Sequence, residues 1–137
     1  MRTFALTMFC AIALLGLTAK SASAIAPFQA EFIKLYINDH PNEEFAKMVK
    51  TKAKCHICHQ GKKIGPHHNV YGEQLEELLD AKTDKKDKAK IQEALKKVAE
   101  MHSDPNDDKS PTFGELIAKG ELPGGDLEKA KEEPKEE

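Results

Sequence analysis

The sequence contains no tryptophan, and its 137 residues include only six phenylalanines and two tyrosines. Two of the phenylalanines lie within the first 24 residues, so six aromatic side chains remain for the rest of the chain. A single domain with so few large apolar side chains can build only a modest hydrophobic core. A large apolar cofactor would supply much of the apolar area that these side chains do not provide.

Arginine is nearly absent, because Arg2 is the only one in the chain. From residue 25 onward, 19 lysines stand against 23 acidic residues, which gives a net charge of −4. The two signs are interspersed along the sequence. Binding to phosphate backbones requires a basic stripe or patch, so this balance argues against nucleic acid as a partner.

Long apolar runs are missing except at the N-terminus. Arg2 precedes an apolar run over residues 4–17, and Ala22-Ser23-Ala24 follows as a small-residue cleavage signal. The run is shorter than the roughly 20 residues that a membrane-spanning helix needs. We therefore interpret residues 1–24 as a secretory signal peptide and not as a membrane anchor. We expect an exported protein, periplasmic or otherwise extracytoplasmic, with no membrane span after cleavage.

The part of the chain after the leader shows no strand pattern and no internal repeat, which predicts an all-α domain over residues 25–123. The last residues, 124–137, are rich in glycine, lysine and glutamate and are predicted to form a charged tail without stable structure. Apolar periodicity and capping residues predict helices within residues 27–37, 42–55, 71–81, 84–101 and 112–120.

The predicted helix ends carry specific signals. Asn42 is a predicted N-cap, Thr112 and Glu115 form a predicted capping box, and Gly120 is expected to end the last helix. Residues 61–72, with three glycines, are predicted to form a loop.

Cysteine is scarce as well. Of three cysteines, Cys10 lies in the leader, which leaves Cys55 and Cys58 in the sequence Cys55-His56-Ile57-Cys58-His59. Two thiols three residues apart on one helical turn can both form thioether bonds to the vinyl groups of a haem, and the following histidine then reaches the iron. Such attachment takes place outside the cytoplasm, where the leader directs the chain.

Other chemistries use the same residues. Two cysteines in an exported protein would by default form a disulfide, and a C-x-x-C pair can be a redox-active dithiol. Zinc could bind Cys55 and Cys58 together with two of His59, His67 and His68. The order Cys-x-x-Cys-His together with the export signal favours covalent haem, with Cys55 and Cys58 as attachment points and His59 as an iron ligand.

With these residues the sequence resembles the class I c-type cytochromes. The resemblance covers the Cys55–His59 motif, the Gly65-Pro66 dipeptide and the placement of Met101 before a last helix. It implies a small cytochrome c-like helical domain wrapped around one covalently bound haem c. It also implies that the Pro66 carbonyl accepts a hydrogen bond from His59 and that Met101 is the distal iron ligand.

The sixth iron ligand has several candidates. Besides Met101, these are His102, His67 and His68, and the position can also be open. Methionine raises the haem potential, whereas a second imidazole is expected to give a lower one. An open position would shift the function toward gas binding or peroxide chemistry.

These observations predict a non-enzymatic electron carrier with one haem, which exchanges electrons with extracytoplasmic redox proteins as donor and acceptor. A group of lysines flanks the motif and could form a positive rim that steers an acidic partner: Lys52, Lys54, Lys62 and Lys63. The alternatives are a haem protein with an open sixth position and a zinc-stabilised binding module. Paired carboxylates, a Ser-His-Asp set and a phosphate-binding glycine loop do not stand out, which argues against hydrolase and nucleotide chemistry.

Overall fold

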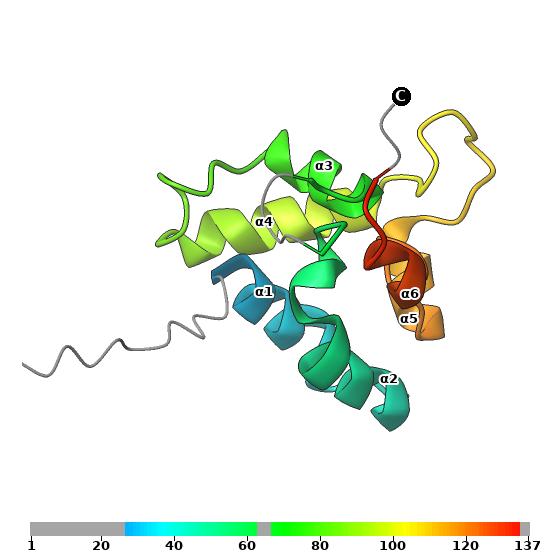
Figure 1. The fold of residues 1–137 in the computed structure, drawn as a ribbon. Helices are drawn as coiled ribbons and strands as arrows, with labels where there is room; N and C mark the ends of the chain where they lie inside the picture. Colours follow the sequence, from blue (N-terminus) through cyan, green and yellow to red (C-terminus); the bar gives the residue numbers. More distant parts are fainter. Residues whose placement is uncertain (1–26, 63–66, 135–137) are drawn as a thin grey trace, which may run out of the picture.

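The computed structural model describes residues 27–62 and 67–134 of the chain (Figure 1). In these ranges all regular elements are helical, and extended pairing is limited to isolated bridges, so the all-α prediction is confirmed. None of the helices in the described ranges is both long and apolar enough to cross a membrane. In chain order the α-helices are α1 (Pro27–Phe32), α2 (Glu43–Met48), α3 (Val70–Glu76), α4 (Lys88–Ala99), α5 (Phe113–Lys119) and α6 (Leu127–Ala130).

Three shorter helical segments extend the first two helices. The π-helical segment Ile33–Ile37 (η1) follows α1, and the π-helical segment Val49–Ala53 (η2) follows α2. The 3-10 segment Lys54–Ile57 (η3) then leads into the cysteine motif. The helix predicted over residues 27–37 is therefore confirmed, with a π-helical end. The one predicted over residues 42–55 is continuous only to Ala53, because Lys54 has a positive φ.

The predicted caps are present. Asn42 caps α2, since its side chain accepts a hydrogen bond from the Phe45 N–H at 3.0 Å. Thr112 and Glu115 form the predicted capping box of α5. Gly120 ends α5 in the left-handed conformation with φ of 82°, which a glycine adopts without steric cost.

The segment between α3 and α4 differs from the prediction. The helix expected over residues 71–81 ends at Glu76, and the one expected from residue 84 begins at Lys88. Aspartate side chains explain both differences. Asp87 caps α4 by accepting from the Lys90 N–H, which sets its start, and two others bond backbone N–H groups that a longer α3 would use. Asp80 accepts from the N–H groups of Lys82 and Thr83, and Asp84 accepts from the N–H of Asp80.

The C-terminal tail also differs from the prediction over residues 124–134. Asp126 caps α6, and the side chain of Ala130 is buried against the rest of the domain. The backbone N–H of Gly61 donates to the Ala130 carbonyl at 2.8 Å. A charged composition predicted disorder, but the charges face outward while Leu127 and Ala130 pack inward. The predicted signal peptide lies outside the described residues.

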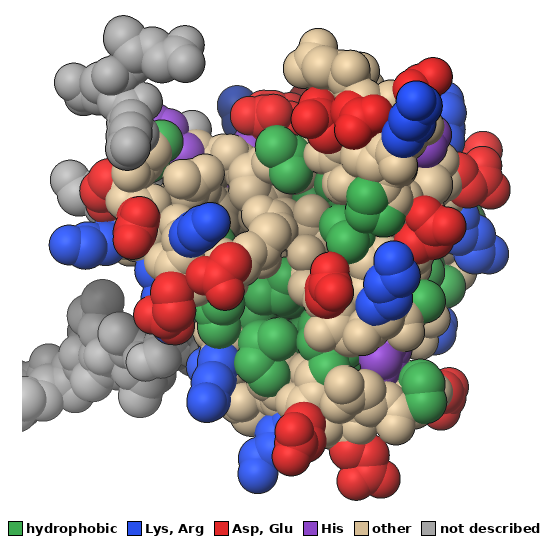
Figure 2. All heavy atoms as spheres, turned by 90° about the vertical axis from the view of Figure 1, so that its right-hand side faces the viewer, with side chains coloured by type: hydrophobic (Ala, Val, Ile, Leu, Met, Phe, Trp, Pro, Cys, Tyr) green, Lys and Arg blue, Asp and Glu red, His purple; other side chains and the backbone are tan. Residues whose placement is uncertain are grey.

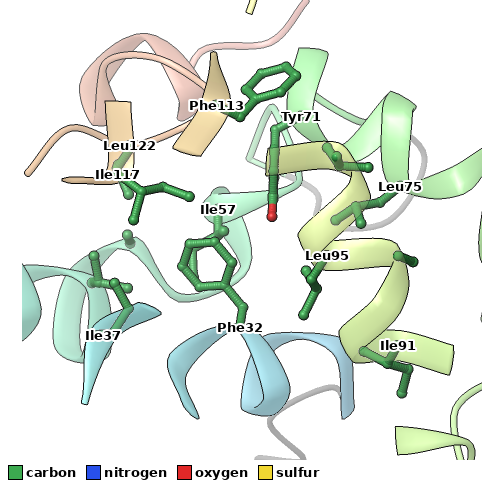
Figure 3. Close-up of a cluster of buried hydrophobic side chains, with 14 of the residues drawn as sticks. Phe32, Ile37, Ile57, Tyr71, Leu75, Ile91, Leu95, Phe113, Ile117 and Leu122 are labelled. Atoms are coloured by element: carbon green, nitrogen blue, oxygen red, sulfur yellow. The ribbon is translucent and has the colours of Figure 1, made fainter. Parts of the chain in front are cut away.

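The helices share one core, in which α1, α3 and α5 each pack against α4 (Figure 1). The predicted apolar stripe of α4 is buried, with Ile91, Leu95 and Val98 fully enclosed. Across from it, the rings of Phe32 and Phe113 meet that of Tyr71 edge to face, with ring centroids 5.8 Å and 5.2 Å away (Figure 3). Such contacts join α1, α3 and α5 in the part of the core next to the cysteine motif.

The surface is charged with both signs. On the face shown in Figure 2, lysine and acidic side chains alternate around a small group of hydrophobic ones. The interspersed pattern of the sequence is thus retained on this face.

Candidate functional site

The cysteine motif lies where the helix leading from α2 breaks. Lys54, the residue before the motif, has a positive φ of 47°, which is uncommon for a residue with a side chain. The following turn is held by the Cys55 carbonyl, which accepts from the N–H groups of Cys58 and His59 at 3.2 Å and 3.0 Å. Cys55 is exposed, Cys58 is half-buried, and both thiols are free. The two sulfur atoms are thus available for a shared covalent partner.

Both cysteines and His59 line one cleft of about 830 Å³. This volume lies within the range of roughly 300–1,000 Å³ that is typical of sites for small molecules and cofactors. Its apolar wall consists of Phe28 on α1, Leu75 on α3 and Leu78 and Leu79 in the segment after α3. The cleft therefore combines two thiols and an imidazole with an apolar surface.

Charged side chains lie around the same cleft. Four carboxylates, Glu76, Glu77, Asp80 and Asp84, are joined by three lysines, Lys54, Lys82 and Lys90. Lys90 donates to Asp84 at 2.6 Å. This bond is the main reason that the pKa of Asp84 is lowered. Of the lysines expected to form a rim, Lys54 lines the cleft, Lys52 and Lys62 are exposed, and Lys63 lies outside the described residues.

A short antiparallel ladder sets the position of His59. The N–H of Gln60 donates to the His67 carbonyl at 3.1 Å, and the N–H of Asn69 donates to the Cys58 carbonyl at 3.0 Å. His59 and His68 are therefore directly opposite residues of the ladder, and such residues project from the same face. Their rings lie side by side with centroids 4.6 Å apart.

Hydrogen bonds orient both imidazoles. His59 Nδ1 lies 3.3 Å from the His67 carbonyl oxygen. Because a carbonyl oxygen only accepts, Nδ1 carries the proton and Nε2 keeps its lone pair. The Pro66 carbonyl, which the resemblance assigned to this bond, lies outside the described residues, and the carbonyl that the structure brings to His59 is that of His67. His68 Nδ1 lies 2.9 Å from the Glu76 carboxylate.

Burial affects the protonation of the site. Desolvation, and secondarily the neighbouring His68, lower the pKa of His59, so its imidazole is neutral at neutral pH. Desolvation, and secondarily Cys55, raise the pKa of Cys58 to about 12, so this thiol keeps its proton. A neutral imidazole is the form of histidine that binds metals.

Two residues that the sequence did not single out hold the motif against α3. Asn69 is buried, its amide nitrogen donates to the carbonyls of His56 and Ile57, and its oxygen accepts from the first turn of α3. Gly72 approaches so closely that an added Cβ would lie 2.0 Å from the Cys58 carbonyl oxygen. An Asn at the start of a helix is a common capping residue, and this signal could have pointed to Asn69, whereas nothing local marks Gly72.

The methionine expected as distal ligand lies elsewhere. Met101 follows α4 and packs against the core, and its carbonyl accepts from the Phe113 N–H at 3.0 Å. His102 Nδ1 is bonded to the Ser110 carbonyl. Neither side chain lines the cleft that holds Cys55, Cys58 and His59. Of the alternatives, His67 is exposed, and His68 lines the cleft.

The zinc alternative predicts four ligands in one place. Within residues 27–62 and 67–134, no group of three or more His, Cys, Asp and Glu side chains is arranged to hold a metal ion.

Comparison with known proteins gives no match to a family model, to a curated protein or to a solved structure. The functional assignment therefore depends on the residues and geometry of this chain.

Proposed function

We propose that this protein binds one haem covalently through Cys55 and Cys58, with His59 as an iron ligand, and that it acts as an electron carrier after export. The observation that carries the proposal is the order Cys55, Cys58, His59 on the wall of a single apolar cleft. In this proposal the helical domain is cytochrome c-like and wraps around the haem.

The chemistry of the cleft fits a haem. Thioether formation adds a thiol S–H across a vinyl C=C bond, with sulfur bonded to one carbon and hydrogen to the other, so it needs no oxidant. The two free thiols of Cys55 and Cys58 supply both additions. The neutral His59 has Nε2 free to bind iron, and the His67 carbonyl holds the ring in that tautomer. When bound, the haem would supply reversible one-electron exchange at its iron.

The protein's own residues would tune and position that chemistry. Phe28, Leu75 and Leu79 line the cleft with apolar surface, and such a setting would favour the less charged, reduced state of a bound iron centre. The exposed Lys52 and Lys62 lie in the segments on either side of the motif and would attract an acidic redox protein there, beyond the four carboxylates and three lysines that line the cleft itself. The expected partners are thus extracytoplasmic electron donors and acceptors.

The test is a pyridine haemochrome spectrum of the full chain, expressed with its leader and with the haem-attachment machinery. The expected result is a c-type band that survives acid-acetone extraction and disappears in the Cys55→Ala, Cys58→Ala double variant. The matched control is His102→Ala, since His102 lies away from the cleft and its loss leaves the band in place. A colourless wild-type protein that retains zinc would sink the proposal in favour of the zinc-stabilised module.

Electron transfer is tested on the same preparation. Reduction by ascorbate and reoxidation by ferricyanide should restore the starting spectrum over repeated cycles. A haem that bleaches or is not reduced by either ascorbate or dithionite would exclude a carrier function.

A further inference from the structure

The segment that follows α5, residues 122–134, returns to the cysteine motif, and we call it the strap. In Figure 1 it is the orange-to-red end of the ribbon, and it contains α6. Leu122, Pro123 and Ala130 are buried, so the strap is part of the folded domain although it is rich in charged residues. None of its residues, all of which the structure describes, lines the cleft of the motif. Its contacts with the motif are therefore made from outside that cleft.

The first contact joins Gly124 to Asn69. A Cβ at Gly124 would lie 2.0 Å from the amide nitrogen of Asn69 and 2.4 Å from its amide carbon, so a glycine is needed for this approach. The Asn69 amide is not free to turn aside, because it is buried and bonds the carbonyls of His56 and Ile57 as well as two N–H groups of α3. The strap thus lies directly against the side chain that holds the turn between the cysteines.

The second contact joins the strap to Gly61 and Lys62, just after His59 in the sequence. The Gly61 N–H donates to the Ala130 carbonyl at 2.8 Å, and the Lys62 N–H donates to the Glu133 carboxylate at 3.1 Å. Gly61 is buried and has a φ of 95°, a conformation that favours glycine. A Cβ there would lie 2.8 Å from a carboxylate oxygen of Glu133, so the strap approaches closely on this side as well.

His59 lies between these two contacts. The Cys58 carbonyl before it accepts from the Asn69 N–H at 3.0 Å, and the Gln60 N–H after it donates to the His67 carbonyl at 3.1 Å. The same His67 carbonyl lies 3.3 Å from His59 Nδ1, which is at the long end of the range for such a bond. A small shift of this segment would therefore weaken the bond that keeps the proton on Nδ1.

We propose that the strap is a positioning element for His59: it acts through Asn69 and Gly61 and keeps Nδ1 on the His67 carbonyl, which leaves Nε2 for iron. The inference rests on the proposed function, since it concerns the histidine assigned to iron. A hydrogen bond from Nδ1–H makes an imidazole a stronger ligand, which stabilises oxidised iron and lowers its reduction potential. Loosening the strap should therefore raise the potential while haem attachment through the cysteines is retained.

The test is the reduction potential of the full, haem-loaded protein, measured by spectroelectrochemical titration in three variants. Glu133→Ala removes the hydrogen-bond acceptor together with its charge, whereas Glu133→Gln removes the charge and keeps an oxygen acceptor. The matched control Glu132→Ala removes the charge of the exposed neighbouring residue. We expect an upward shift in Glu133→Ala that is at least twice the shift in either other variant. Equal shifts in all three, which would show an effect of charge alone, or an unchanged potential in Glu133→Ala would overturn the proposal.

Hydrogen exchange measures the same coupling without a readout at iron. The Gln60 N–H, which shares the His67 carbonyl with His59, is expected to exchange at least tenfold faster in Gly124→Ala and in Glu133→Ala than in wild type. The Phe113 N–H, bonded to the Met101 carbonyl, is the internal control. An unchanged Gln60 rate in either variant would overturn the proposal. The outcomes separate the two proposals: absence of covalent haem refutes the proposed function, whereas covalent haem with an unchanged potential in Glu133→Ala refutes only the role of the strap.

Discussion

The amide nitrogen of Asn69 donates a hydrogen bond to the Ile57 carbonyl oxygen at 3.2 Å, which joins the start of α3 to the turn between the two cysteines. The same nitrogen reaches the His56 carbonyl at 3.1 Å. The amide oxygen accepts from the N–H groups of Tyr71 and Gly72. One buried side chain thus satisfies four backbone groups, two in the motif and two in α3.

Replacing Asn69 tests this junction. Asn69→Ala leaves buried carbonyl and N–H groups unpaired, so we expect the free energy of unfolding to fall by about 3 kcal/mol. The matched control is Asn42→Ala, which removes a single, more exposed capping bond and should cost about 1 kcal/mol. Chemical denaturation of both variants gives the comparison. Equal losses would show that Asn69 is only a helix cap.

Gly72 tests how closely α3 must approach the motif. A Cβ at this position would lie 2.0 Å from the Cys58 carbonyl oxygen, which is backbone and cannot move independently of the ladder. Gly72→Ala is therefore expected to lower the free energy of unfolding by about 2 kcal/mol or more. Val70→Ala on the same helix is the control, since Val70 is exposed and its change should stay within about 0.5 kcal/mol. If Gly72→Ala has the same melting temperature as the wild-type protein, the close approach of α3 to the motif is contradicted.

Tyr71 carries a hydroxyl group that is buried with no hydrogen-bond partner in the described part of the chain. Tyr71→Phe removes that group and keeps the ring contacts with Phe32 and Phe113. We expect this variant to be as stable as wild type or more stable by up to about 1 kcal/mol, as measured by denaturant titration. Tyr71→Ala, which also removes the ring, should lose about 4 kcal/mol. A loss in Tyr71→Phe comparable to that in the alanine variant would reveal a partner for the hydroxyl.

The same hydroxyl predicts a pH dependence. Burial, followed by the nearby Cys58 and Tyr36, raises the pKa of Tyr71 well above its usual value of 10.0. A group whose pKa is higher in the folded state contributes stability below the unfolded value and loses it as the pH rises. The wild-type protein should therefore lose stability above about pH 10, and Tyr71→Phe should lose less over that interval. Denaturation midpoints at pH 9 and pH 11 give the measurement, and identical decreases in both proteins would exclude this role.

Local chemistry explains which parts of the fold could be predicted from the sequence. The α4 stripe and the Thr112–Glu115 box depend on residues within four positions of one another, and both are as expected. The early end of α3 was missed, because it depends on aspartate side chains that bond the backbone of the next segment.

In the candidate site, too, the local features were predicted and those that depend on contacts between segments were not. Cys55, Cys58 and His59 form a local motif, and the structure brings them to one cleft. The pairing of His59 with His68 joins residues nine positions apart, and no periodic signal in the sequence marks it. Met101 was expected at the site because of its position before the last helix, but its backbone is bonded to the start of α5 instead.

The C-terminal segment gives the last prediction. The N–H of Gly61 donates to the Ala130 carbonyl, and the N–H of Lys62 donates to the Glu133 carboxylate at 3.1 Å. Removing residues 126–137 exposes both N–H groups to water, so their hydrogen exchange should accelerate by at least tenfold. The Phe113 N–H, which is bonded to Met101, serves as the internal control and should exchange at an unchanged rate. If Gly61 and Lys62 remain as protected as in the full chain, α6 does not hold the loop that follows the cysteine motif.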